Sequence, residues 1–303
     1  TSTYFDSFIV GLLNTLLVAG IGILFATIIG FTVGIMRLSS NWLIAKIAEA
    51  YVEILRNIPL LLQIFFWYFA VLRALPKPKQ SLELYDSFFL NNRGLFIPDT
   101  VFGEGSSIIF YLLWLTIIIS IGIFIWAKRR QNRTGERFPA FYVSTALILG
   151  TFFISLAATG FPVSFEYPEL KGFNFKGGVK LIPELVALTF ALAMYTASFI
   201  AEVVRGGIMA VSKGQTEAAK SVGLKQNLIL RLIIIPQALR VIVPPLTNQY
   251  LNLTKNSSLA AAIAYPDLVL VFAGTALMQT GRAIEIVSIT MLTYLSLSIS
   301  ISV

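Results

Sequence analysis

The stretch SFIVGLLNTLLVAGIGILFATIIGFTVGIM, residues 7–36, contains no charged side chain and lies between Asp6 and Arg37. A helix needs roughly 20 apolar residues to cross the hydrocarbon core of a bilayer. The apolar residues run continuously rather than in alternation, which favours a helix over a strand. No basic segment precedes the stretch and no small-residue cleavage pattern follows it, so we expect a membrane-spanning helix rather than a cleaved signal peptide.

Six more runs have few or no charges, and we expect each of them to cross the membrane. They are residues 57–72, 105–127, 138–160, 185–201, 241–262 and 286–303. The first of these is short, and the helical spacing of Ile47, Tyr51, Ile54 and Leu55 extends it backward. The sequence therefore predicts an all-α, polytopic membrane helix bundle with about seven transmembrane spans in a single domain over residues 1–303. Because the chain begins with Thr1 and stops inside an apolar run, we expect it to be part of a longer polypeptide.

The composition agrees with a membrane protein and excludes several kinds of chemistry. Charged residues make up 13% of the chain, hydrophobic residues 56%, and the mean hydropathy is +0.80. Soluble domains carry about 25% charged residues. The absence of cysteine and histidine excludes disulfides, thiolate nucleophiles and the commonest general base. There is no P-loop sequence, so we expect this chain to bind no nucleotide through such a loop. We also expect it to hold no metal and no other cofactor.

The distribution of charge predicts the orientation in the membrane. If the spans alternate, one side holds the segments 37–57, 127–139 and 205–240, with fourteen basic and four acidic side chains. The other side holds the segments 73–107 and 161–182, with seven basic and six acidic side chains. Cytoplasmic loops of membrane proteins carry the excess of Lys and Arg. We therefore expect the N-terminus of this chain outside and its C-terminus in the cytoplasm.

Two polar segments leave alternatives open. The predicted outside loop 73–107 is long enough for docking, but it could equally be a tolerated surface insertion. The basic loop of Lys128, Arg129, Arg130, Arg133 and Arg137 is chiefly an orientation signal. Contact of this loop with anionic membrane lipids is open, whereas nucleic-acid binding is not expected.

The segment SKGQTEAAKSVGLKQNLILRLIIIP, residues 212–236, is the predicted cytoplasmic loop before the sixth span. Ser212 followed by Gln215 has the spacing of a capping box, and Gly223 stands where a glycine ends a helix over residues 213–222. A second short helix is expected over residues 226–235, ending at Pro236. We interpret the loop as a stiff helix–turn–helix element that can seat in a partner protein.

Seven residues of this loop resemble a known motif. They are Glu217, Ala218, Ala219, Gly223, Ile233, Ile235 and Pro236. Their spacing resembles the motif EAA-x3-G-x9-I-x-L-P of the permease subunits of bacterial ABC importers. The sole departure is Ile235 in place of leucine, which keeps an aliphatic side chain. The resemblance implies that Gly214, Glu217, Ala218, Ala219, Gly223 and Pro236 couple the chain to a separate ATPase.

Three further segments resemble the polar amino-acid branch of that family. Residues 53–63 are similar to E-x-x-R-G-T-P-L-L-x-Q, with Asn57 and Ile58 replacing the usual Gly-Thr. Residues 201–208 resemble A-E-x-x-R-G-G-I, and residues 252–268 resemble the sixth-span pattern of that branch. The permeases of general L-amino-acid importers are the most similar, and they carry extra helices before the core. The resemblance covers residues 1–75 and 183–303, so residues 108–160 are expected to be an inserted helix pair added to a five-span type I importer core.

The resemblance implies an ATP-driven importer of amino acids that works by alternating access. The implied partners are an ABC ATPase dimer carrying ATP and Mg²⁺, an amino-acid-binding protein outside the membrane, and a second permease, more plausibly a related subunit than an identical copy. The candidate substrate-pathway residues are Glu53, Arg56, Gln63, Thr196, Ser198, Glu202, Asn252, Lys255, Ser257 and Ser258.

Purely structural roles remain open for these residues. Glu53 could pair with Arg56, and Lys255 could pair with Glu202 or Glu53. Gln63, Thr196 and Ser198 could make packing hydrogen bonds, and Glu217 could balance Lys213 or Lys220.

Two other classes of function compete with the importer. An ion-coupled secondary transporter needs buried acids in mid-span, whereas the acids here lie at span ends: Glu53, Glu184, Glu202 and Glu285. A membrane-embedded enzyme would need a catalytic set, and Lys255 near Ser257 and Ser258 is its sole candidate. Both alternatives therefore have less support than the importer.

Overall fold

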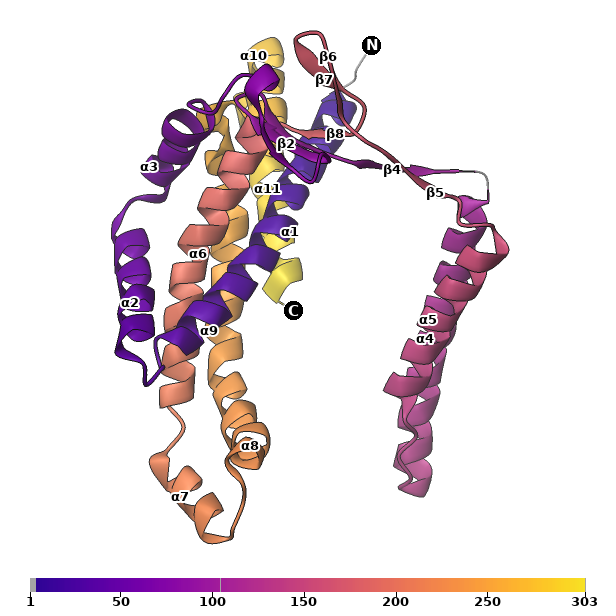
Figure 1. Ribbon diagram of the computed structural model, residues 1–303, viewed down its shortest axis with the longest axis vertical. Coiled ribbons are helices and arrows are strands. Elements are labelled where there is room, and N and C mark those ends of the chain that lie inside the picture. The colour runs from indigo at the N-terminus through magenta and orange to yellow at the C-terminus, as the bar shows by residue number, and fades with distance from the viewer. Residues whose placement is uncertain (1–3, 104, 303) are drawn as a thin grey trace. The chain divides into compact units, whose positions relative to one another are not determined.

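The computed structural model of the chain (Figure 1) describes residues 4–103 and 105–302. Six helices in these residues are long and apolar enough to cross a membrane, and a bent helix pair raises the number to seven if it counts as one span. The all-α membrane bundle with about seven spans is thereby confirmed. Thr1 and Val303, which bound the predicted domain, lie outside the described residues.

The chain divides into two compact units. The first consists of Thr1–Ser81, Leu90–Leu95 and Leu181–Val303, and the second of Leu82–Phe89 and Phe96–Lys180. The second unit contains the helices that correspond to the predicted insertion at 108–160. The prediction of a single permease domain over residues 1–303 stays a prediction.

The core of the first unit is built on the contact between α1 (Tyr4–Met36) and α6 (Pro183–Met209). Small residues of α1 allow the two backbones to approach closely. A Cβ atom at Gly30 would lie 2.6 Å from Ile200 Cβ, and one at Gly34 would lie 2.8 Å from Val204 Cβ. Close approach through glycine is how helices associate when lipid replaces water as the solvent.

The second span is not the continuous helix that the spacing of Ile47, Tyr51, Ile54 and Leu55 predicts. Helix α2 (Trp42–Asn57) is followed by α3 (Leu60–Phe65) and the π-helix η1 (Phe66–Leu72), and the two parts meet at 104°. The break lies at Pro59, which has no N–H and forces Ile58 into an extended conformation with φ −95° and ψ 126°. The backward extension was therefore wrong as a single straight helix.

Residues 213–302 are almost entirely helical, in a series of α, π and 3₁₀ segments. Its elements are α7 (Lys213–Ser221), α8 (Gln226–Ile229), the π-helix η3 (Leu230–Ile234), α9 (Ile235–Asn256), the 3₁₀ helix η4 (Ser257–Ile263), the π-helix η5 (Leu268–Ala276), α10 (Leu277–Thr280) and α11 (Ala283–Ser302). The apolar helix at Leu268–Thr280 was not predicted as a separate element.

The prediction that Pro236 ends a short helix was also wrong, because the helix continues from Gln226 to Ile263. The Ile235 N–H bonds to the Leu230 carbonyl, five residues back. This π turn shifts the hydrogen-bond register just before Pro236. The proline therefore stands in the first turn of α9, where the absence of its N–H costs little free energy.

The second unit contains a helical hairpin of α4 (Ser106–Thr134) and α5 (Ala140–Ala158). Strands β4 (Asp99–Phe102) and β5 (Val163–Glu166) flank the hairpin and pair antiparallel, with Asp99 opposite Glu166 and Phe102 opposite Val163. Strands β6 (Glu169–Lys171) and β7 (Asn174–Lys176) form a second antiparallel pair. These strands were not predicted.

The predicted loop at 73–107 likewise holds regular structure. It contains the 3₁₀ turn η2 (Pro78–Gln80) and the strands β1 (Leu82–Leu84), β2 (Phe88–Asn91) and β3 (Gly94–Ile97), which join β8 (Val179–Leu181) in a sheet of order β1-β2-β3-β8. Gly94 has φ +127°, and a Cβ there would overlap the Leu181 carbonyl oxygen. Glycine is therefore required for this strand pairing.

Candidate functional site

The loop at residues 212–236 folds as the sequence predicts in its first half. The Ser212 hydroxyl oxygen accepts a hydrogen bond from the Gly214 N–H at 3.3 Å, which confirms the N-cap. Gly223 has φ +78°, and its N–H donates to the Lys220 carbonyl at 2.9 Å. The glycine therefore ends α7 in the predicted way and turns the chain toward α8.

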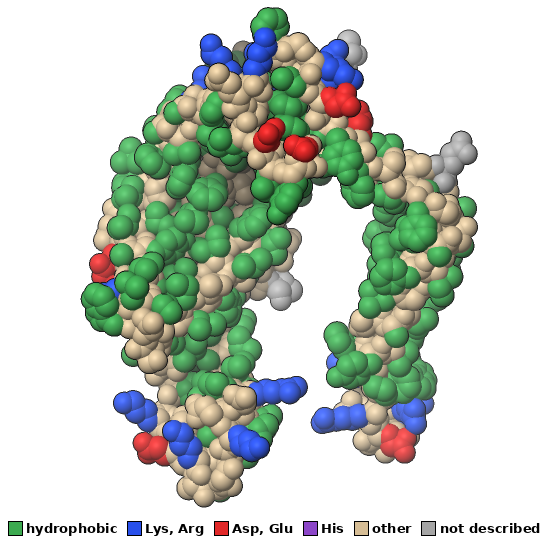
Figure 2. All heavy atoms as spheres, in the orientation of Figure 1, with side chains coloured by type: hydrophobic (Ala, Val, Ile, Leu, Met, Phe, Trp, Pro, Cys, Tyr) green, Lys and Arg blue, Asp and Glu red, His purple; other side chains and the backbone are tan. Residues whose placement is uncertain are grey.

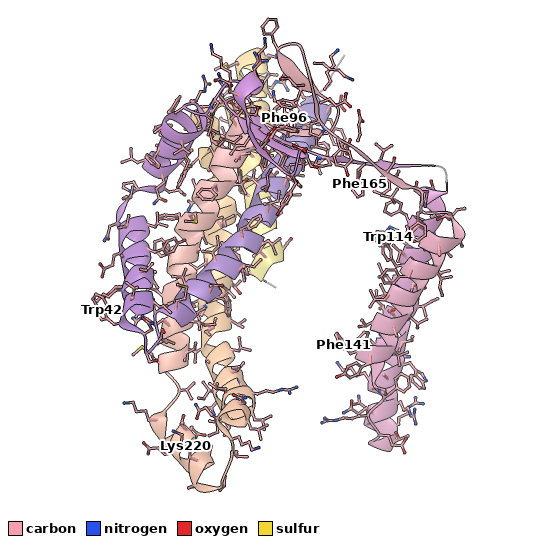
Figure 3. All side chains as sticks on the ribbon, viewed as in Figure 1. Trp42, Phe96, Trp114, Phe141, Phe165 and Lys220 are labelled. Atoms are coloured by element: carbon pink, nitrogen blue, oxygen red, sulfur yellow. The ribbon has the colours of Figure 1, made fainter. Side chains whose placement is uncertain are left out.

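The two faces of α7 differ in exposure. Ala219 is buried, as is Ile229 of the neighbouring α8, whereas Gly214, Glu217 and Ala218 are exposed. Glu217 makes no ion pair with Lys213 or with Lys220, which Figure 3 labels on this helix. The loop thus presents small residues and an unpaired carboxylate on its open face, and Pro236 is also exposed.

At the C-terminal end of α6, Glu202 is held by two arginines. Arg37, the residue after α1, forms an ion pair with Glu202 Oε1, and Arg205 Nη2 lies 3.0 Å from Glu202 Oε2. Partial burial lowers the pKa of Arg37, and the charge of Arg205 lowers it further, but a guanidinium stays protonated at neutral pH. The pair fixes the end of α1 to α6, and sequence reasoning did not single out Arg37 for it.

Of the three residues predicted on the second span, Gln63 and Arg56 make contacts within this chain. The Gln63 amide donates to the Leu55 and Ile58 carbonyls at 2.8 and 2.9 Å, and so satisfies acceptors that the break at Pro59 exposes. The Arg56 guanidinium lies 5.0 Å from the centroid of the Phe199 ring on α6. Glu53 is exposed and does not pair with Arg56.

Thr196 and Ser198 are buried in the middle of α6. The Ser198 hydroxyl donates to the Tyr195 carbonyl at 2.6 Å, within its own helix. Their burial favours the helix-packing role over direct contact with a substrate.

At the N-terminal end of α6, Glu184 is held in a second polar contact. The Tyr68 hydroxyl donates to Glu184 Oε1 at 2.6 Å, and Arg73 Nη2 donates to the Tyr68 oxygen at 2.7 Å. Tyr68 lies on η1, so the contact joins the bent span to α6. From the sequence, Glu184 was noted only as an acid at a span end, and its contact with Tyr68 and Arg73 was not predicted.

The break between η4 and η5 is held by polar residues of α1. Asn14 Nδ2 donates to the Pro266 carbonyl at 2.8 Å, and the Thr15 hydroxyl oxygen accepts from the Leu268 N–H at 3.1 Å. Asp267 is fully buried, and its Oδ1 accepts from the Leu270 N–H at 2.8 Å as the cap of η5. The sequence signal for this arrangement was the Tyr-Pro-Asp sequence at 265–267, which was noted only as part of a resemblance.

The polar residues at the end of α9 and the start of η4 lie on two faces. On η4, Ser257 is buried and Ser258 half-buried, and each donates to a carbonyl three residues back, at Thr254 and Lys255 respectively. Asn248, Asn252 and Lys255 are exposed and spaced four and three residues apart, which places them on one face. Within residues 4–103 and 105–302, the Lys255 ammonium has no ion pair, so neither predicted pairing with Glu202 or Glu53 forms.

Comparison with known proteins identifies the family. Residues 129–303, more than half of the chain, match the family described as "Binding-protein-dependent transport system inner membrane component". The chain belongs to this family. Members are multi-pass inner-membrane subunits that form the membrane passage, while a separate ATPase hydrolyses ATP and a substrate-binding protein acts with them. This membership supports the importer and not the ion-coupled alternative.

Individual relatives extend the similarity over nearly the whole chain. The chain is 53% identical to the putative amino-acid ABC transporter permease protein YhdX of Escherichia coli over 99% of this chain and 76% of the relative. It is 54% identical to the general L-amino acid transport system permease protein AapQ of Rhizobium johnstonii, over 98% of this chain and 74% of the relative. A crystal structure of an amino acid ABC transporter with histidines shares the fold, with a TM-score of 0.57, 21% identity, and coverage of 99% of this chain and 91% of that one.

Proposed function

We propose that the chain is one of two permease subunits of an ATP-driven importer that moves amino acids inward by alternating access. The relatives named for amino-acid transport are 53% and 54% identical over nearly the whole chain, which supports this substrate class. A relative named for glutamate, glutamine, aspartate and asparagine transport, BztB of Rhodobacter capsulatus, is 42% identical over 99% of this chain and 77% of its own length. These names support amino acids as the substrate class, and transport measurements decide which amino acids are carried.

The observation that carries the two-subunit proposal is the exposed polar face of α9. A charged ammonium on a membrane-spanning helix is costly against lipid and faces a partner or an aqueous cavity. Asn248, Asn252 and Lys255 all lie on the open surface of this single chain. A second permease, related to but different from this chain, would cover this face and enclose a pathway lined by Asn252 and Lys255.

The other pathway candidates divide by burial. Gln63, Thr196, Ser198 and Ser257 are buried in contacts within this chain, which favours roles in positioning helices. Glu53, Arg56 and Glu202 lie toward the ends of α2 and α6, and Ser258 is half-buried beside the exposed face. The pathway proposal therefore rests most on Asn252 and Lys255.

Coupling to the ATPase would pass through the loop at 212–236. An ATPase dimer with bound ATP and Mg²⁺ would hold the exposed face of α7 from the cytoplasm, and this chain itself would bind no cofactor. The continuous helix from Gln226 to Ile263 would carry the displacement into the membrane. The N-terminus would lie outside, where a binding protein delivers amino acids to the segments 73–107 and 161–182.

The test of coupling is transport by the complete complex in proteoliposomes with its binding protein. Glu217→Lys reverses the unpaired charge on the exposed face of α7, and we expect it to lower ATP-driven amino-acid uptake by about tenfold or more while the complex still assembles. Gln215→Lys is the matched control, because it introduces the same charge at an exposed position of the same helix. Equal uptake by both variants would contradict the coupling assignment.

The same vesicles test the class of transporter. Uptake is measured for a panel of competing amino acids with ATP supplied on the ATPase side. Undiminished uptake without ATP, under an ion gradient, would overturn the ATP-driven importer.

A further inference from the structure

The turn of the α4–α5 hairpin carries an uncompensated positive charge. Of its five basic side chains, Arg130 is paired, with Nη2 2.7 Å from Glu136 Oε2 and the guanidinium 5.6 Å from the centroid of the Trp126 ring. The other four are exposed and form no ion pair within the part of the chain that the structure describes: Lys128, Arg129, Arg133 and Arg137. Figure 2 shows Lys and Arg side chains gathered at this end, below the hydrophobic surface of the hairpin.

The turn also forms a surface hollow of about 460 Å³ with two kinds of wall. Lys128 and Gln131, three residues apart on α4, line its polar part. Phe124 and Ile125 on α4, with Phe141 and Tyr142 on α5, line its apolar part. Phe141, which is exposed, is labelled on the hairpin in Figure 3.

Two contacts within the turn join the helices that line the hollow. The Trp126 and Phe138 rings meet edge-to-face with centroids 5.2 Å apart, which joins the end of α4 to the start of α5. Gly135 has φ +74°, and its N–H closes α4 on the Gln131 carbonyl at 3.0 Å. Both walls of the hollow are therefore held in place by contacts within the turn.

The depth of Lys128 along the hairpin matches the level of lipid phosphates. Helix α4 has no charged residue from Ser106 to Ala127, a length of about 33 Å at the usual helical rise, close to the thickness of the hydrocarbon core. Lys128 is the first charge after this span. We therefore expect its ammonium at the level where lipid headgroups meet the acyl chains.

We propose that this hollow binds one anionic phospholipid. The headgroup phosphate contacts Lys128 and Gln131, and the upper acyl chain lies against Phe124, Ile125 and the aromatic side chains of α5. A free phosphate ion would satisfy the charge but leave the apolar wall uncovered, whereas an anionic lipid complements both walls at once. The site lies outside the loop at 212–236 and the polar face of α9, so it is independent of the transport proposal.

The experiment compares two charge-neutralising variants in the full complex, reconstituted in nanodiscs of phosphatidylcholine with a small fraction of phosphatidylglycerol. Lys128→Gln removes the cation in the hollow, and Arg129→Gln removes a neighbouring exposed cation that does not line it. Phosphatidylglycerol retained after detergent extraction is counted by native mass spectrometry. We expect Lys128→Gln to weaken retention about fivefold, since a basic residue at the membrane surface contributes about 1 kcal/mol, and Arg129→Gln to change it less than about twofold.

Equal loss in both variants would show diffuse attraction to the charged surface and overturn the site, as would unchanged retention in Lys128→Gln. Competition separates the source of the phosphate group. Short-chain dioctanoyl phosphatidylglycerol should displace the bound lipid, and glycerol phosphate at the same concentration should not. Equal displacement by both compounds would indicate a free-phosphate site, and an unchanged helical content by circular dichroism verifies that each variant is folded.

Discussion

Helix α6 and the α4–α5 hairpin both span the membrane, but the more apolar of the two regions is the less buried one. The most apolar window of α4 has a mean hydropathy of 2.7 and is 17% buried, whereas that of α6 has a mean hydropathy of 1.7 and is 61% buried. In water the more apolar helix would be the buried one. In lipid, association follows close packing and polar contacts, so the helix with small and polar residues occupies the centre.

The residues of the two regions explain the reversal. The buried positions of α6 are rich in alanine, with Ser198, Thr196 and Gly207 among them. Helix α4 exposes large aliphatic and aromatic side chains, such as Trp114, labelled in Figure 3, and Ile118. The hairpin is thus suited to contact lipid along its length, and α6 to contact other helices. If this contrast is right, matched substitutions should cost much more in α6 than in the hairpin.

The largest effect is expected at adjacent glycines of α6. A side chain at Gly207 would overlap Ile242 of α9, whereas a Cβ at Gly206 meets no atom within 4 Å. We expect Gly207→Leu to lower the free energy of unfolding by about 3 kcal/mol and Gly206→Leu to leave it nearly unchanged. The midpoint of thermal unfolding of the purified complex, followed by tryptophan fluorescence, measures both. Similar midpoints for the two variants would contradict the contact of α6 with α9.

The next effect compares two ion pairs. Glu202→Gln deprives Arg37 and Arg205 of a shared, partly buried partner, and we expect a loss of about 2 kcal/mol. Glu136→Gln in the hairpin removes the partner of Arg130 at an exposed site, where about 0.5 kcal/mol is expected. The same unfolding measurement checks both values. A larger cost for Glu136→Gln would reverse the comparison between the two regions.

The smallest effect compares single hydroxyl groups. The Tyr51 hydroxyl donates to the Met194 carbonyl of α6 at 2.8 Å, and that of Thr116 lies 3.1 Å from the Thr151 hydroxyl within the hairpin. We expect Tyr51→Phe to cost about 1 kcal/mol and Thr116→Val about 0.5 kcal/mol, as for interhelical hydrogen bonds in membranes. If hydrogen exchange at the amides of α6 were unchanged in Tyr51→Phe, the contact would not contribute to the core.

The sequence predicts the elements whose causes are local. Runs without charge predict the spans, Ser212 predicts the start of α7, and Gly223 predicts its end, because each depends on residues within a few positions. Pro59 and Pro236 show the limit of such rules. Both follow helical segments, yet one produces a 104° break and the other is absorbed by a π turn at Leu230–Ile234. The outcome depends on the neighbouring hydrogen bonds, which proline alone does not specify.

Contacts between distant residues could not be predicted. A pairing of Lys255 with Glu202 or Glu53 was left open, but the fold brings Arg37 and Arg205 to Glu202 instead. Asn14 and Thr15 meet residues 266 and 268 across more than 250 positions of sequence, so no local pattern reveals them. For the same reason, Lys255 was recognised as unusual from its span, while its exposure on one face of α9 required the structure.

The helix from Gln226 to Ile263 has a mechanical consequence. At the α-helical rise its 38 residues span about 57 Å, with the turn at Gly223 before one end and the break at Pro266 just beyond the other. A tilt of about 5° around the first end would move the second by about 5 Å, the advance of roughly one helical turn. If the ATPase holds the loop at 212–236 as proposed, this helix acts as a lever arm, and a small angular change outside the membrane becomes a displacement as large as an amino-acid side chain inside it.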